Sequence, residues 1–234
     1  WLLEPAGAGA CASSSNAACC TLSLAAGRLP AGVCQAARRS RKRGFSARKG
    51  AANLDAFDCF LRGMWHFNQM TPEDHPRAET WFRRAVELDA KFAQGYMGLA
   101  RVMSSFIWYG WSQDFDQHLS DLYRAATQAV ALDDRDPYTH YMLAYASLLS
   151  GLHRQALAEA QRTIDLNPNF ALGHSVLGAV RLFMGHFAEA HEPLLRCMRL
   201  SPNDPIAPFF MSFIALAHYH QGNYEEAVHL AEAG

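Results

Sequence analysis

Histidine and cysteine are the residue types in this chain that could bind a metal or serve as a catalytic base. The chain has 11 histidines and 6 cysteines among 234 residues. His218 and His220 stand two positions apart, which places them about 200° apart around a helix and keeps them off one shared face. No glycine-rich phosphate loop and no nucleophile motif is present. The histidines are therefore expected to be packed or surface residues, and the sequence predicts no catalytic residue, cofactor or metal site.

The cysteines fall into two groups with different expected roles. Cys59 and Cys197 lie at helical core positions, where an unpaired cysteine behaves as a small hydrophobic residue. A reduced, intracellular and cytoplasmic setting fits this usage best. Zinc binding is the alternative for the other four, but they form no C-x-x-C pair and have no histidine nearby. These four are Cys11, Cys19, Cys20 and Cys34.

Charge divides the chain near residue 50. Residues 1–50 carry 8 Lys and Arg against one acid, whereas residues 51–234 carry 13 Lys and Arg against 21 acids. The first segment is rich in Ala, Gly, Ser, Cys and Arg, and such a composition buries too little apolar surface to offset the entropy lost on ordering. We therefore expect residues 1–50 to be disordered. The alternative is that they are a wrong-frame translation of G+C-rich DNA.

Neither a membrane nor a nucleic acid is the expected partner. No window of about 18 apolar residues exists, so no membrane span is predicted. The basic run at 38–43 could attract nucleic acid or an anionic membrane. It lacks interleaved aromatic residues apart from Phe45, however, and a solvated linker explains it better.

Beyond residue 50 the sequence repeats at an interval of 34 residues. Ala156 and Ala190 are separated by this interval, and so are Pro168 and Pro202. It is the period at which two-helix units stack into a solenoid. The pattern predicts five antiparallel helix pairs, the last of them truncated. Their approximate bounds are 55–90, 93–134, 137–168, 171–202 and 205–234.

Local signals place the helices and turns within these pairs. Asp55 is expected to cap the first helix, and Pro208 is expected in the first turn of a later one. Pro193 falls inside a helix and predicts a mild kink. An aromatic loop at 108–111 is expected to join the helices of the second pair. Glycines at the other hairpin turns predict left-handed backbone conformations, at Gly151, Gly185 and Gly222.

The repeated residues resemble a known family. Leu177-Gly178, Gly185, Phe187, Ala190 and Pro202 resemble the tetratricopeptide repeat pattern. The resemblance implies an all-α, right-handed superhelical solenoid over residues 51–234. It also implies a protein-interaction scaffold that is not itself an enzyme and binds no small-molecule substrate.

A narrower resemblance concerns the start of the repeats. The segments 53–58, 61–63 and 70–74 are similar to the opening of the repeat region in bacterial class III adenylate cyclase proteins. Similar regions follow winged-helix regulators. The resemblance implies a sensory or regulatory region of a bacterial signalling protein. The alternative is the C-terminal regulatory part of a class III adenylate cyclase whose catalytic domain lies outside this chain.

The family resemblance also implies which residues line a concave groove formed by the first helices of successive units. Family members that bind chaperone tails hold a C-terminal carboxylate with a clamp of Lys and Asn, which this groove lacks. Its one predicted cation is Arg101, so an apolar peptide or helix is the expected ligand. The groove candidates are Phe57, Phe60, Met64, Met97, Arg101, Tyr138, Tyr141, Tyr145, Leu182, Phe183, Tyr219 and His220.

The last unit is expected to be open. Its second helix has about eleven residues after Asn223, too few to cover the apolar helix before it. We therefore expect an exposed apolar patch and self-association of the chain through it.

Overall fold

A computed structural model describes residues 54–204 and 206–233. The chain divides into two units, Trp1–Lys49 and Gly50–Gly234. The predicted disorder of residues 1–50, their four cysteines and their basic run lie outside the described residues. The description below therefore concerns the second unit.

The described residues form ten α-helices and no strand, which confirms the all-α prediction. The first helices of the five pairs are α2 (Leu54–Phe67), α4 (Ala93–Trp108), α6 (Pro137–Leu149), α8 (Ala171–Phe183) and α10 (Ala207–His220). The second helices are α3 (Asp74–Leu88), α5 (Phe115–Leu132), α7 (His153–Leu166), α9 (Phe187–Leu200) and α11 (Tyr224–Ala233). We number these pairs as units one to five.

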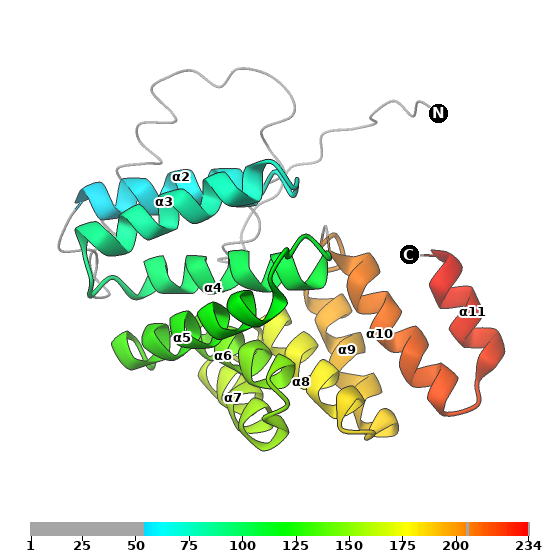
Figure 1. Ribbon diagram of the computed structural model, residues 1–234. Coiled ribbons are helices and arrows are strands. Elements are labelled where there is room, and N and C mark those ends of the chain that lie inside the picture. Colours follow the sequence, from blue (N-terminus) through cyan, green and yellow to red (C-terminus); the bar gives the residue numbers. More distant parts are fainter. Residues whose placement is uncertain (1–53, 205, 234) are drawn as a thin grey trace, which may run out of the picture. The chain divides into compact units, whose positions relative to one another are not determined.

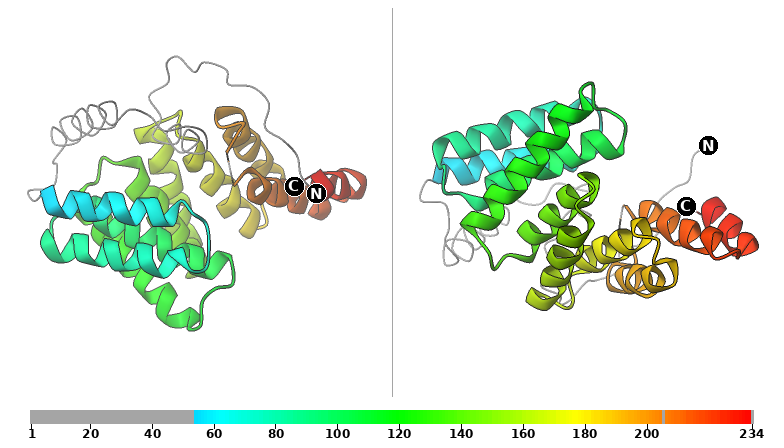
Figure 2. Two further views of the ribbon diagram at one scale, coloured as in Figure 1. Left: turned by 90° about the horizontal axis from the view of Figure 1, so that it is seen from above. Right: turned by 60° about the horizontal axis from the view of Figure 1, so that its bottom comes forward.

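The units stack in sequence order, with the first helices on the inner side. Each first helix contacts the first helix of the next unit. Side chains also bridge successive second helices, as between Arg83 of α3 and Asp121 of α5. Each second helix contacts the first helix of the following unit. Figure 1 and both views in Figure 2 show this succession of hairpins from α2 and α3 to α10 and α11. The inner layer is therefore made of α2, α4, α6, α8 and α10.

Small residues allow the helices within a unit to pack closely around a few large ones. In unit one, Ala78, Phe82 and Ala85 of α3 are fully buried. The Phe82 ring fills the space between α2 and α4: a Cβ atom at Gly63 or at Gly98 would lie 2.5 Å from a Phe82 ring carbon. Only glycine leaves room for the ring at these two positions.

The predicted turns and helix starts are mostly confirmed. The hairpin glycines have left-handed φ angles of 72°, 81° and 81° at Gly151, Gly185 and Gly222. Pro208 lies in the first turn of α10. Pro193 is buried inside α9, which runs unbroken to Leu200, and its kink stays a prediction.

Two local predictions are wrong. Asp55 does not cap α2 but lies within its first turn, because the helix already begins at Leu54. Trp108 is not a loop residue, because α4 continues through it to 16 residues, whereas α6 and α8 have 13. No glycine or proline interrupts 99–109, so nothing ends α4 at the position where the other first helices stop.

Candidate functional site

Several of the predicted groove residues belong to the core. Their side chains are at most 7% exposed, and they pack against neighbouring helices. The ring of Phe60, for example, lies 5.7 Å from that of Phe82 and 5.7 Å from that of Phe92. These residues support the inner face from behind and do not contact a ligand on it. They are Phe57, Phe60, Met97, Tyr145 and Leu182.

Arg101 of α4 lies on the inner face, half-buried between aromatic rings from two other units. Its guanidinium carbon is 4.3 Å from the Phe67 ring centroid and 5.2 Å from the Tyr138 ring centroid. Its Nη1 atom donates to the sulfur of Met64 at 3.6 Å. Arg101 thus joins α2, α4 and α6 at one point, and three of the predicted groove residues (Met64, Arg101 and Tyr138) meet there.

The electrostatic environment of Arg101 differs from that of the described arginines that pair with carboxylates. Arg83 and Arg124 both pair with Asp121, and Arg181 lies beside Glu189. Within the described part of the chain, Arg101 has no carboxylate at ion-pair distance. An aromatic ring attracts a cation through its face and leaves the N–H donors at the guanidinium edge available. Those donors can bind a carboxylate or a backbone carbonyl.

The predicted tyrosine stripe extends this surface along α6. The ring of Tyr138 lies 5.7 Å from that of Tyr141 and 5.0 Å from that of Phe170, and Tyr141 lies 5.1 Å from Tyr145. Burial raises the pKa of Tyr141 and of Tyr145. Tyr138 and Tyr141 remain half-buried, so they add an aromatic wall beside Arg101, whereas Tyr145 belongs to the core.

Towards unit five the inner face is filled by the protein's own side chains. The Trp108 ring lies 5.9 Å from Tyr145, 5.2 Å from Phe209 and 6.0 Å from Phe213. The Phe183 ring packs edge-on against Phe213 at 6.0 Å. These rings, which we call the Trp108 cluster, connect α4 of unit two with α10 of unit five. The half-buried residues beside Arg101, by contrast, lie on units one to three.

The remaining predicted groove residues lie near the end of the chain. Phe183 is 48% and Tyr219 57% exposed. His220 is exposed and stacks on Phe187, with ring centroids 4.3 Å apart and planes 6° from parallel. Tyr219 contacts Tyr224 of α11. None of these side chains contacts the Arg101 site, so the structure separates the predicted groove residues into two surfaces.

Sequence reasoning missed Trp108 and Phe170 as inner-face residues. The aromatic pattern at 108–111 predicts a loop at Trp108, although the uninterrupted helical sequence before it is a usable signal. Phe170 precedes α8 and is its N-cap residue, a position without a helical pattern to reveal which side it faces. Phe67 and Phe209 also contribute rings to the inner face.

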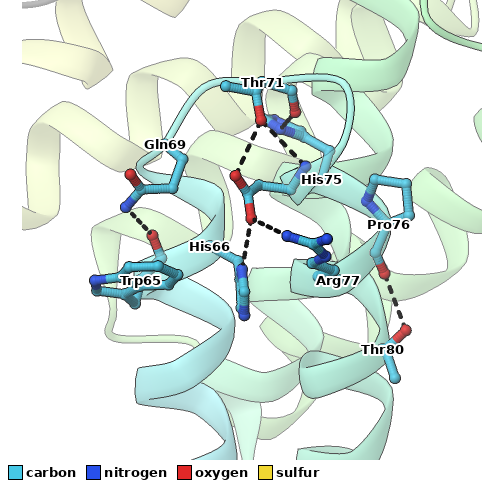
Figure 3. A network of polar contacts seen from close by, with 9 residues as sticks. Trp65, His66, Gln69, Thr71, His75, Pro76, Arg77 and Thr80 are labelled. Carbon is cyan, nitrogen blue, oxygen red and sulfur yellow. Dashed lines mark hydrogen bonds and ion pairs between the residues drawn. The ribbon is translucent and has the colours of Figure 1, made fainter.

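A polar network at the turn of unit one contains a hydroxyl, a carboxylate and a histidine, which are residue types found in catalytic sites. Its hydrogen bonds, however, are arranged as in a helix cap (Figure 3). The Asp74 backbone N–H donates to the Thr71 hydroxyl, which in turn donates to the Asp74 carboxylate, both at 3.1 Å. His66 Nδ1 lies 2.8 Å from the same carboxylate. The hydrogen bond from His66 lowers the pKa of Asp74. In a catalytic triad the histidine lies between hydroxyl and carboxylate; here the carboxylate is in the middle.

Clustered metal ligands and membrane spans are both absent from the described residues. No group of three or more His, Cys, Asp or Glu side chains in 54–204 and 206–233 converges on one point. None of the described helices is long and apolar enough to cross a membrane.

Comparison with known proteins supports a repeat protein. No protein-family model matches the chain. Over 91 residues the chain is 31% identical to Hsp70-Hsp90 organizing protein 2 of Arabidopsis thaliana. That match covers 38% of this chain and 16% of the relative, so the chain spans a small part of that protein's length.

Solved structures identify the fold. A thermophilic TPR protein of Thermus thermophilus superposes with a TM-score of 0.59 at 18% identity, over 75% of this chain and 87% of that one. The pilF protein of Pseudomonas aeruginosa superposes with a TM-score of 0.57 at 19% identity, over 77% of this chain and 76% of that one. Together with the 34-residue period and the stacked helix pairs, these likenesses show that the chain has the tetratricopeptide-repeat fold.

Proposed function

We propose that this protein is an interaction scaffold that binds a peptide or helix of another protein on the inner face of units one to three. The observation that carries the proposal is Arg101, an arginine held by aromatic rings with no carboxylate partner in the described chain. The similarity to a chaperone-organizing protein supports a protein as the partner. Enzymatic activity forms no part of the proposal.

The chemistry of the surface defines the ligand. Tyr138 and Tyr141 offer apolar contact at low cost in side-chain entropy, as aromatic residues do at many interfaces, and the buried Phe67 supports Arg101 from behind. Arg101 is the cation that they surround. An apolar segment carrying one carboxylate or an exposed carbonyl is complementary to this arrangement. A highly acidic tail is not, because one guanidinium cannot neutralise several charges.

The test uses a defined probe. Peptides are selected from a phage-displayed random library on the full chain, and the affinity of the best peptide is measured by fluorescence anisotropy. Arg101→Gln should weaken binding by about 10-fold or more, since a hydrogen bond to a charged group contributes about 1.5–3 kcal/mol. Arg154→Gln on exposed α7 is the matched control and should bind normally. Equal binding by both variants would refute the assignment to Arg101.

More specifically, we propose that this scaffold is the regulatory region of a bacterial signalling protein in the cytoplasm. It rests on the similarity of 53–58, 61–63 and 70–74 to the repeat regions of class III adenylate cyclase proteins. Reading the DNA upstream of codon 51 in all three frames tests it. A cyclase or winged-helix domain there supports the regulatory role, and the lack of both in every frame removes it.

We also propose that unit five binds a second copy of this chain. Positions 37 residues apart are equivalent in units four and five, as Gly185 and Gly222 show. Ala179 and Leu182 of unit four are 0% and 3% exposed, whereas their equivalents Leu216 and Tyr219 are 38% and 57% exposed. The face that each earlier unit uses for stacking is thus apolar and uncovered in unit five.

Sedimentation of the full chain tests this contact. The average mass should rise with concentration, and Tyr219→Lys should keep the chain monomeric. Leu152→Lys, at a 45% exposed position of unit three, is the control and should leave association unchanged. A monomer at every concentration would contradict the proposal.

A further inference from the structure

His191 of α9 and His218 of α10 meet at the junction of units four and five. Their Nε2 atoms are 3.2 Å apart. The ring planes are nearly perpendicular, at 87°, with centroids 4.9 Å apart. Both residues are half-buried. They lie 27 positions apart, outside the repeat period, so their pairing cannot be read from the sequence pattern.

We propose that His191 and His218 form a binding site for a late first-row divalent ion such as Zn²⁺. Two nitrogens bound at about 2.0–2.1 Å to a tetrahedral ion are about 3.3 Å apart. The observed 3.2 Å between the Nε2 atoms is close to this spacing. Imidazole is a ligand that zinc, copper and nickel accept. The site goes beyond the proposed peptide-binding function and does not depend on it.

The surroundings of His218 favour the required tautomer. Its Nδ1 atom lies 3.5 Å from the side-chain amide of Asn223. The oxygen and nitrogen of an amide are interchangeable by rotation. With its oxygen toward the ring, Asn223 accepts the Nδ1 proton, and the Nε2 lone pair remains available for the ion. A polar group holding the outer nitrogen is the usual arrangement around a metal-bound histidine.

The pair also has to be explained without a metal. Two Nε2 atoms at 3.2 Å can share one proton, which makes one imidazole the donor and the other the acceptor. Neutral rings retain the lone pairs that bind a metal. Ion binding requires the donor ring to carry its proton on Nδ1 instead, which exchange with water allows, so that both neutral rings present an Nε2 lone pair to the ion.

Two protein ligands leave the other coordination positions to water or to a donor on another molecule. Such a site is weaker than a structural zinc site, which has four protein ligands. Its direct effect is to link α9 to α10 and so to fix unit five against unit four. Binding to the folded state alone also stabilises that state, and the stabilisation rises with the logarithm of the ion concentration once that exceeds the Kd.

The experiment is a zinc titration followed by the ring ¹⁵N signals of assigned histidines. The full chain is used without an affinity tag, and its accessible thiols are blocked with N-ethylmaleimide so that cysteine does not compete. ZnCl₂ should shift the signals of His191 and His218 together and saturate at one equivalent. MgCl₂ should shift neither, because Mg²⁺ prefers oxygen ligands.

Variants separate this site from other zinc binding. In His191→Gln the response of His218 should vanish, and in His218→Gln the response of His191 should vanish. His229→Gln, at an exposed position of α11, is the matched control and should leave both responses unchanged. The proposal is overturned if neither signal responds in the unmodified chain. It is also overturned if, in either single variant, the signal of the remaining histidine still responds to ZnCl₂ with the same midpoint concentration.

Discussion

At the scale of single residues, glycines determine much of the packing, because they leave space for large side chains of the neighbouring helix. Phe82 is fully buried because Gly63 of its own unit and Gly98 of the next leave room for its ring. The same device recurs in unit four, where a Cβ atom at Gly178 would lie 2.5 Å from Leu194 Cγ. Each of these glycines sits inside a helix, where glycine is otherwise unfavourable.

The first prediction concerns Gly98. In an open helix, replacing glycine by alanine stabilises by about 0.5–1 kcal/mol. At Gly98 the added Cβ collides with Phe82, and such overpacking costs about 1–3 kcal/mol. We therefore expect Gly98→Ala to lower the free energy of unfolding in urea. A higher unfolding midpoint for this variant would show that the ring moves aside freely.

A second prediction at this scale concerns His140. Burial lowers its pKa, but hydrogen bonds to Glu159, at 2.6 Å, and to the Asp134 carbonyl raise it more, so the net pKa lies above the ordinary value of 6.5. A raised pKa means that the pair stabilises the fold fully below 6.5 and loses this contribution as the pH rises through the raised value.

Glu159→Gln should therefore cost more stability at pH 6 than at pH 9. A difference of about 1–2 kcal/mol is expected for losing a charged hydrogen bond, measured by urea unfolding at both pH values. Glu189→Gln is the control, because its exposed contact with His186 spans 4.0 Å and should show no such difference. An equal cost of Glu159→Gln at the two pH values would contradict the assignment.

Single residues also show how much of the structure can be predicted from the sequence. The repeat pattern located the helix pairs and most of their turns, because the 34-residue period follows the stacking of two-helix units. It does not separate core from groove on a first helix, which is covered on most sides. Phe60 and Met64 both follow the inner-face pattern, yet Phe60 is 7% exposed and Met64 half-buried. Only the position of α3 and α4 around them decides between the two roles.

At the scale of elements, α4 determines how the inner face is divided. Its extra turn carries Trp108 past the point where the shorter first helices end, and the ring reaches Phe209 and Phe213 of α10. The hairpin glycines of units three to five predicted their turns correctly. Unit two has its left-handed glycine only at Gly110, so its helix continued beyond the predicted end.

The third prediction tests the Trp108 cluster. Trp108→Ala removes contacts with three rings and should destabilise by about 2–4 kcal/mol, below the full cost of a completely buried aromatic because the ring is half-buried. Thermal unfolding should show a clear fall in midpoint. Trp65→Ala is the matched control, since Trp65 also lies on a first helix but is 54% exposed. Similar midpoints for the two variants would mean that the cluster contributes little.

At the scale of the repeat region, the arrangement departs from a purely linear solenoid. In a linear array each repeat contacts only its neighbours. Here the Trp108 cluster joins unit two to unit five. Arg101 lies between rings from units one and three. The period predicted the stacking, but contacts across several units leave no periodic signal in the sequence.

The most direct test of the proposed binding face is methyl NMR of the full chain labelled at methionine, titrated with the peptide selected on it. Met64 touches Arg101, whereas Met184 and Met198 pack against the core of units three to five. We predict that the Met64 signal shifts with the binding curve while those of Met184 and Met198 stay unchanged. Shifts at Met184 or Met198 with an unchanged Met64 would contradict binding on the inner face of units one to three.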